Sequence, residues 1–128
     1  MKIERIHHIA IICSDYKRSK DFYMRILGLE LITETYRKER DSYKLDLKAG
    51  ENSQIELFSF HNPPERVSYP EAAGLRHLAF EVLDIEKEIE DLHKHGIEAE
   101  PVRVDELTGK RFTFFGDPDG LPIELYEI

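Results

Sequence analysis

The amino-acid sequence predicts an α+β fold in which one domain, residues 1–128, contains two tandem βαβββ modules. The first observation is an internal repeat, because HHIAIICSDYKRSKDFYMRILGLEL from residue 7 resembles RHLAFEVLDIEKEIEDLHKHGIEAE from residue 76. The second is the order of patterns, since each half has a strand-like run, a helical run and three further strand-like runs. A third is the length of 128 residues, which suits one ordinary domain.

The two halves match at four positions in register. A histidine opens each half, an aspartate follows it by seven residues, and a glycine follows it by 20 residues in the first half and 19 in the second. A glutamate lies 48 residues after the histidine in the first half and 47 in the second. Chance can supply one such match, but four in register favour a duplicated unit. The matched pairs are His8 and His77, Asp15 and Asp84, Gly28 and Gly96, and Glu56 and Glu124.

The first module covers about residues 1–60 and opens with an apolar, β-branched strand over 5–12. Ser14 or Asp15 can cap the following helix, and Gly28 can end it in the left-handed conformation. The apolar positions of this helix fall largely on one face, and they are Tyr16, Phe22, Tyr23, Ile26 and Leu27. The remaining strands are expected over 29–36, 42–48 and 54–60.

The second module covers about residues 75–128 and repeats this order. The strand RHLAFEV leads to a helix that Asp84 can cap and Gly96 can end, with Ile85, Ile89 and Leu92 on one face. EAEPVRV is expected to be an edge strand, because Pro101 has no backbone N–H to donate. KRFTFFG and LPIELYE are the last two strands, joined by a tight DPDG turn. Between the modules, residues 61–74 are rich in Pro and Gly and are expected to form a linker or lid.

Composition limits the classes of partner. The net charge of −8 argues against nucleic acid and anionic membranes, which require a basic surface, although it does not exclude a small anionic ligand. The N-terminal MKIERIHH has no apolar signal region, and no apolar run is long enough to span a membrane. The single cysteine, Cys13, excludes an intrachain disulfide and suits a reducing compartment. A soluble cytoplasmic protein is therefore expected.

Strand alternation predicts a metal site. His8, Glu56, His77 and Glu124 are expected in the middle of strands on the inner faces of two curved sheets. If these sheets enclose a cavity, two imidazoles and two carboxylates converge as mixed N/O ligands for one divalent ion, Zn, Ni, Co, Mn or Fe. Any one of them alone is more often a packed histidine or a solvated glutamate, but the repeat places all four at equivalent positions. His7 is the rival of His8, and alternation sends it to the opposite face.

The motifs HHIAI, IEL, RHLAF and DPDGLPIELYE resemble the vicinal oxygen chelate superfamily, and within it the glyoxalase I-like members. The similarity covers essentially the whole chain. It implies the glyoxalase/bleomycin resistance/dihydroxybiphenyl dioxygenase fold, a cup around a divalent metal that chelates vicinal oxygens of the substrate. It also implies that the metal ligands are His8, Glu56, His77 and Glu124. Members commonly pair modules within or between chains, so a homodimer is expected.

The same resemblance implies a lyase or isomerase that moves a proton through an enediolate of a small α-carbonyl substrate, either free or joined to a thiol. Glu124 is then the first candidate for the base and Glu56 its partner for returning the proton. Glyoxalase I usually has Arg and Asn, which hold glutathione, where this sequence has Ile12 and Phe60. The alternatives are a non-catalytic antibiotic-type binding or resistance protein and a thiol transferase. Candidate substrate-binding residues are Phe58, Phe60, Arg66, Tyr69, Phe112 and Phe114.

Overall fold

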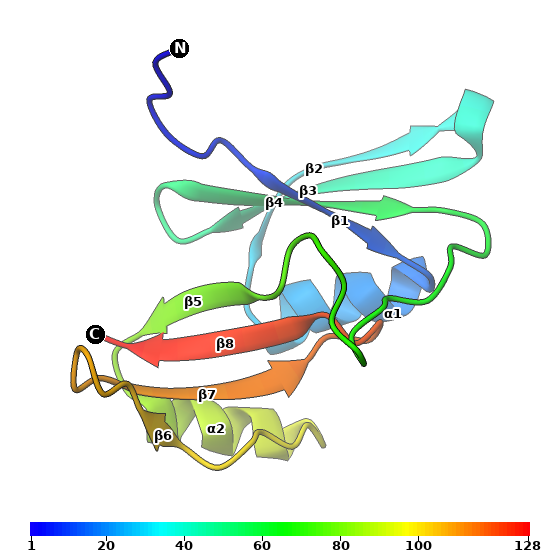
Figure 1. The fold of residues 1–128 in the computed structure, drawn as a ribbon. Helices are drawn as coiled ribbons and strands as arrows, with labels where there is room; N and C mark the ends of the chain where they lie inside the picture. Colours follow the sequence, from blue (N-terminus) through cyan, green and yellow to red (C-terminus); the bar gives the residue numbers. More distant parts are fainter. The chain divides into compact units, whose positions relative to one another are not determined.

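The computed structural model describes residues 1–128 as two compact units, Met1–Glu65 and Arg66–Ile128. Each unit consists of a four-stranded mixed sheet and one α-helix, which confirms the predicted fold class of two βαβββ modules (Figure 1). The chain passes from one unit to the other inside the predicted linker, and residues 61–74 contain no helix or strand.

The first module has the strand order β1-β4-β3-β2 (Figure 1). β1 runs parallel to β4, whereas the β4–β3 and β3–β2 pairs are antiparallel. A π-helical turn over Phe22–Ile26 extends α1, and a 3₁₀ turn over Lys38–Arg40 joins β2 to β3. The elements are β1 Ile9–Cys13, α1 Tyr16–Asp21, β2 Glu30–Arg37, β3 Ser42–Ala49 and β4 Ser53–Ser59.

The second module repeats the arrangement with the strand order β5-β8-β7-β6. β5 is parallel to β8, and the other two pairs are antiparallel. Its elements are β5 Leu78–Val82, α2 Ile85–Lys94, β6 Arg103–Val104, β7 Arg111–Gly116 and β8 Pro122–Glu127. The two modules therefore place their final strand, β4 or β8, in the same position, between the first strand and the third.

The helices begin and end where the sequence predicts. The Asp15 side chain accepts a hydrogen bond from the Arg18 N–H, and Asp84 accepts one from the Lys87 N–H, each at 3.1 Å. These contacts satisfy amide groups that the first helical turn leaves without a partner. Gly28 follows the first helix with a φ of 71°, a left-handed conformation that glycine adopts without steric cost.

The DPDG turn is held by one aspartate. Asp117 Oδ1 accepts hydrogen bonds from the N–H groups of Asp119 and Leu121, at 2.9 and 2.8 Å. Gly120 has a φ of 80°, and its N–H donates to the Asp117 carbonyl at 3.0 Å. The turn thus fixes where β8 begins, and with it the position of Glu124 along the sheet.

Two expectations about the strands were wrong. The histidines are not in the middle of strands, because β1 begins at Ile9 and β5 at Leu78, one residue after His8 and His77 respectively. In each case the parallel ladder begins with the apolar residue that pairs with β4 or β8, Ile9 with Ile55 and Leu78 with Ile123. The run over 98–104 contributes only Arg103–Val104 as a strand, at the sheet edge as predicted.

Alternation gives each sheet two different faces. In the first module one face is apolar and buried, and α1 packs against β4. In the second module Ile123 and Leu125 of β8 are buried, and α2 packs against this strand. The buried residues of β3 and β4 on the apolar face are Leu45, Leu47, Ile55 and Leu57. The glutamates of the IEL motifs therefore belong to the opposite face of each sheet.

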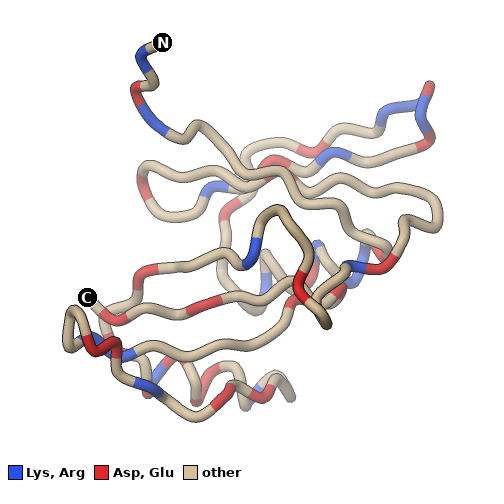
Figure 2. The backbone as a smooth tube through the Cα atoms, viewed as in Figure 1, with Lys and Arg blue, Asp and Glu red and all other residues tan.

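No helix is long and apolar enough to cross a membrane. Acidic and basic residues are interspersed along both modules, as Figure 2 shows, and no long basic stretch interrupts this mixture.

Candidate metal-binding pairs

In the first module, β4 holds Glu56 next to His8. Glu56 pairs with Ala10 of β1 and Asp46 of β3, so it occupies the centre of the sheet. The Nε2 atom of His8 lies 3.6 Å from Oε2 of Glu56. The Glu56 side chain is only 9% exposed, whereas that of His8 is 41% exposed. One donor atom is thus fixed in the sheet and the other is at the surface of the same module.

The other oxygen of Glu56 is engaged by polar neighbours. Lys44 Nζ lies 3.2 Å from Glu56 Oε1, and Gln54 donates to the same oxygen at 3.3 Å. Both groups also contact Asp46 Oδ1, Lys44 at 2.9 Å and Gln54 at 3.1 Å. The pKa of the Lys44 ammonium is raised, chiefly by the hydrogen bond to Asp46 and further by Glu56. The other oxygen of Glu56, Oε2, faces His8 and contacts neither Lys44 nor Gln54.

In the second module, β8 holds Glu124 next to His77. Glu124 pairs with Ala79 of β5 and Phe114 of β7. The Nε2 atom of His77 lies 3.0 Å from Oε2 of Glu124, and the ring of His77 packs edge-on against Phe114 at 5.2 Å between centroids. No lysine, arginine or amide side chain donates a hydrogen bond to Glu124. The side chains placed beside this carboxylate are therefore His77 and Phe114.

The module repeat allows the two surroundings to be compared position by position. Asp46 and Phe114 both lie directly opposite the glutamate, on β3 and β7. Lys44 and Phe112 occupy the next position on the same face of those strands. A charged pair in the first module is thus replaced by a pair of phenylalanines in the second. The backbone repeat is preserved while the chemistry around the two glutamates differs.

The spacing of the donor atoms suits a divalent metal. Ligands bonded at about 2.1 Å are separated by about 3.0 Å in octahedral and about 3.4 Å in tetrahedral geometry. The observed distances of 3.6 Å for His8 and Glu56, and 3.0 Å for His77 and Glu124, lie close to this range. Each module supplies one nitrogen and one oxygen donor. The structure shows no group of three or more potential ligands, so the four-residue site remains a prediction.

His7 lies outside this arrangement. It is exposed, and its ring lies edge-on to that of His8, with 2.9 Å between the two Nδ1 atoms. It forms no contact with Glu56, whereas the Nε2 of His8 faces that carboxylate. The structure therefore favours His8 over His7 as the potential ligand of the first module.

The predicted substrate-binding residues differ in their positions. Phe58 lies two residues after Glu56 on β4, half-buried and on the same face, and Phe60 is exposed just beyond the strand. Phe112 and Phe114 are half-buried on β7 and share the face of Glu124.

The two predicted substrate-binding residues between the modules, Arg66 and Tyr69, do not lie on a strand. Arg66 donates hydrogen bonds to the backbone carbonyls of Leu75 and Arg76, at 2.6 and 2.9 Å. It thus holds the segment that leads to His77. Tyr69 is 96% exposed and contacts neither potential ligand of its module.

Three polar residues near Glu56 or Phe58 were not among the predicted site residues. Alternation in SYKLDLK places Lys44 and Asp46 on one face, and pairing this run with QIELFSF would have brought them beside Glu56. Arg37 carries no comparable signal, because it ends an outer strand whose register depends on tertiary structure. The three are Arg37, Lys44 and Asp46.

Comparison with known proteins identifies the family. The model of the Glyoxalase/Bleomycin resistance protein/Dioxygenase superfamily matches residues 5–125. The chain belongs to this superfamily. The uncharacterized protein YwkD of Bacillus subtilis is 64% identical over 127 residues, covering 99% of both chains. The crystal structure of a glyoxalase family protein from Enterococcus faecalis has a TM-score of 0.90 at 53% identity, covering 99% of this chain and 100% of that one.

Two more distantly similar solved structures come from proteins whose names give different functions. The trypanothione-dependent glyoxalase I of Leishmania major shares 26% identity at a TM-score of 0.73, covering 98% of this chain and 87% of that one. TnmS3, an antibiotic-binding protein from Streptomyces, shares the fold at 21% identity and a TM-score of 0.76, with 99% and 98% covered. The fold therefore occurs in both an enzyme and a binding protein, and the fold alone does not separate the two functions.

Proposed function

We propose that the protein is a divalent-metal-dependent lyase or isomerase of glyoxalase type. The metal would be held by His8, Glu56, His77 and Glu124, two from each module. The observation that carries the proposal is the repeated pair, since each module faces an imidazole nitrogen toward a carboxylate oxygen at the same place in its sheet. A mixed N/O donor set of this kind suits Zn, Ni, Co, Mn or Fe.

The bound cation would act as a Lewis acid on vicinal oxygens of a small α-carbonyl substrate. The protein itself would then have to remove a proton from the carbon next to the carbonyl and return it to the neighbouring atom. A carboxylate within hydrogen-bonding reach of that proton is suited to the task. Both Glu56 and Glu124 belong to the proposed site, so the question is which of them has freedom to move.

Their surroundings favour Glu124 as the base. Glu56 is held through Oε1 by Lys44 and Gln54, and a carboxylate fixed in this way is better suited to hold a metal than to leave it. Glu124 has a contact with His77 through Oε2 but no such restraint on its other oxygen. Phe112 and Phe114 lie on the same face and would limit water near it. We therefore propose that Glu124 accepts the proton and that Glu56 mainly positions the metal.

The substrate is proposed as a class rather than a compound. The Leishmania enzyme is a trypanothione-dependent glyoxalase I, which supports a thiol conjugate of an α-carbonyl compound. Ile12 and Phe60, 55% and 44% exposed, provide apolar surface in place of the polar groups expected to hold glutathione. A thiol other than glutathione, or a substrate without a thiol, fits these positions better. By the resemblance to its superfamily, we also propose that the protein forms a homodimer.

Elemental analysis of untagged, desalted protein tests the metal site. We expect about one divalent metal per chain in the wild type and clear loss in Glu124→Gln. Glu98→Gln is a matched control, because Glu98 is 87% exposed in the same module and makes only a surface contact with His93. Absence of metal in the wild type, even after loading with Zn, Ni, Co and Mn, would contradict the proposal.

Turnover separates the enzyme from the alternative functions. The metal-loaded protein should exchange the α-proton of hemithioacetals or other α-hydroxy carbonyl compounds with solvent deuterium, as NMR can follow. Metal binding without exchange or product would favour a binding or resistance protein like TnmS3. Transfer of a thiol to an electrophilic antibiotic would favour a thiol transferase.

A further inference from the structure

Arg37 lies on the same face of the first module as Glu56. It is the last residue of β2 and pairs with Ser42 of β3. Ser42 is two positions before Lys44 on that strand, and Lys44 pairs with Phe58 of β4. Because directly paired residues share a face, this register brings Arg37 to the face that carries the potential metal ligand.

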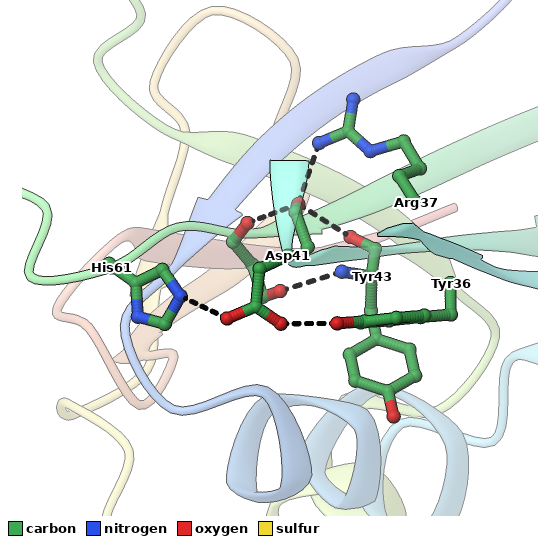
Figure 3. Close-up of polar contacts among 7 residues, drawn as sticks. Tyr36, Arg37, Asp41, Tyr43 and His61 are labelled. Carbon is green, nitrogen blue, oxygen red and sulfur yellow. Dashed lines mark hydrogen bonds and ion pairs between the residues drawn. The ribbon is translucent and has the colours of Figure 1, made fainter. Parts of the chain in front are cut away.

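The guanidinium of Arg37 is stacked and anchored but has no counterion. It lies 4.8 Å from the ring centroid of Phe58, and one terminal nitrogen donates to Ser42 Oγ at 2.6 Å. Figure 3 shows the other terminal nitrogen pointing away from the surrounding polar cluster. The Nε atom is buried and has no hydrogen-bond partner. Of the donors on this side chain, only one is used within the protein.

The one acidic side chain labelled in Figure 3, Asp41, is already engaged by other residues. It accepts a hydrogen bond from the Tyr36 hydroxyl and pairs with His61 Nε2 at 2.8 Å, and it forms no ion pair with Arg37. Lys44 also lies near Phe58, 5.9 Å from its centroid, but its charge is matched by Asp46 and Glu56. Arg37 is therefore the one cation beside Phe58 that lacks an anionic partner.

A half-buried guanidinium without a counterion is unfavourable, because part of its hydration is lost and no carboxylate replaces it. Its planar donors match a carboxylate. A single unpaired positive charge, with Asp46 and Glu56 close by, suits an anion of one charge better than a phosphate of two. Phe58 provides an apolar surface between this cation and the metal-binding carboxylate.

We propose that Arg37 and Phe58 form a subsite for a carboxylate on the substrate. The proposal rests on the function proposed above and narrows its substrate class to α-carbonyl compounds with a carboxylate tail. Glu56 and Phe58 are two residues apart on β4, which corresponds to about 7 Å along the strand. The tail should therefore extend over a few carbon atoms from the chelating oxygens.

Calorimetric titration of nickel-loaded protein with hydroxamates tests the subsite, since a hydroxamate is a vicinal-oxygen chelator. The probes are the monohydroxamates of succinate and glutarate, compared with uncharged butyrohydroxamate. We expect the better carboxylate probe to bind at least about tenfold more tightly than butyrohydroxamate, as a charge-assisted hydrogen bond would provide. Arg37→Gln should remove this advantage and leave butyrohydroxamate binding unchanged. Arg37→Lys should keep only part of the advantage of the carboxylate probe, because the ammonium of lysine lacks the planar set of N–H donors of a guanidinium.

Arg103→Gln is the matched control, because Arg103 stacks on Phe112 at 5.0 Å but is paired with Glu100. It should keep the advantage of the carboxylate probe. Equal binding of charged and uncharged probes, or loss of the advantage in Arg103→Gln alone, would overturn the subsite while the proposed function stands. Binding of the carboxylate probe alone, lost in Arg37→Gln, would support the subsite and contradict metal chelation. Failure of every probe to bind would overturn both.

Discussion

The ammonium of Lys44 lies 3.2 Å from Oε1 of Glu56, and this ion pair has no counterpart at Glu124. The equivalent place in the second module is taken by Phe112, and Phe114 replaces Asp46. Duplication thus conserved the backbone and the two histidine–glutamate pairs, while the residues beside them diverged. Two glutamates with equivalent positions can therefore have unequal roles.

Replacing Lys44 by Met should destabilise the protein. Asp46 and Glu56, with side chains 7% and 9% exposed, would then face each other without the cation that separates them. Gln54 would still donate to both carboxylates, but losing the one lysine that contacts both costs about 1–2 kcal/mol, even after allowing for the partial exposure of Lys44. Chemical denaturation of the metal-free protein measures this loss. Lys48→Met is the control, because Lys48 is exposed and forms no ion pair, and an equal loss there would contradict the role of Lys44.

The unequal roles of the glutamates predict different defects in their amide variants. Glu124→Gln should lower the rate of α-proton exchange by more than about 100-fold at saturating metal, the usual effect of removing a general base. Glu56→Gln should mainly weaken metal binding and keep exchange within about tenfold of the wild type once metal saturates. Exchange rates measured by NMR over a metal titration separate the two effects. Equal loss of exchange at saturation would mean that both carboxylates move protons.

Much of the fold and of the candidate site can be predicted from the sequence, because the two halves of a duplicated chain can be compared with each other. The repeat locates the potential ligands and the helix caps without any tertiary information. The first residue of each strand is harder to predict from the sequence. Alternation puts His8 in a strand, whereas the hydrogen-bonded ladder begins only at Ile9. Strand limits depend on the hydrogen-bonding partner, and local propensity does not specify it.

The neighbours of the glutamates are harder to predict than the glutamates themselves. Lys44 belongs to β3 and reaches Glu56 only because β3 and β4 pair in one register, and a shift by one residue would send it to the apolar face. Arg37 depends on two successive registers, β2 with β3 and β3 with β4. Such contacts are set by the whole sheet, so the short motifs of the sequence do not reveal them.

The helix caps should contribute equally in the two modules. Asp15→Ala and Asp84→Ala each remove a side chain that accepts a backbone hydrogen bond at 3.1 Å. We expect each to cost about 1 kcal/mol of stability, while Asn at either position should retain most of it. Urea unfolding followed by circular dichroism measures both losses. A cap variant as stable as the wild type would show that its helix is held by packing alone.

The pH dependence of stability should reveal how much the ionised carboxylate of Glu127 contributes to the stability of the fold. Its carboxylate accepts two hydrogen bonds from Arg111, at 2.9 and 2.7 Å, and one from the Ile85 N–H at the start of α2, at 3.0 Å. Arg111 first, and then this backbone N–H, lower the pKa of Glu127 below its ordinary value of 4.5. A lowered pKa means that the ionised form stabilises the fold above pH 4.5, and that this contribution is lost as the pH falls through the folded-state pKa.

Glu127→Gln should therefore lower the melting temperature at pH 7, and the difference from the wild type should shrink as the pH falls below 4.5. Thermal unfolding between pH 3 and pH 7 measures the difference, with Glu106→Gln as the control, because Glu106 is exposed and forms no ion pair. The control should follow the wild type at every pH. A difference for Glu127→Gln that stays constant over this range would mean that the carboxylate acts through its shape, and that its charge contributes nothing to the stability of the second module.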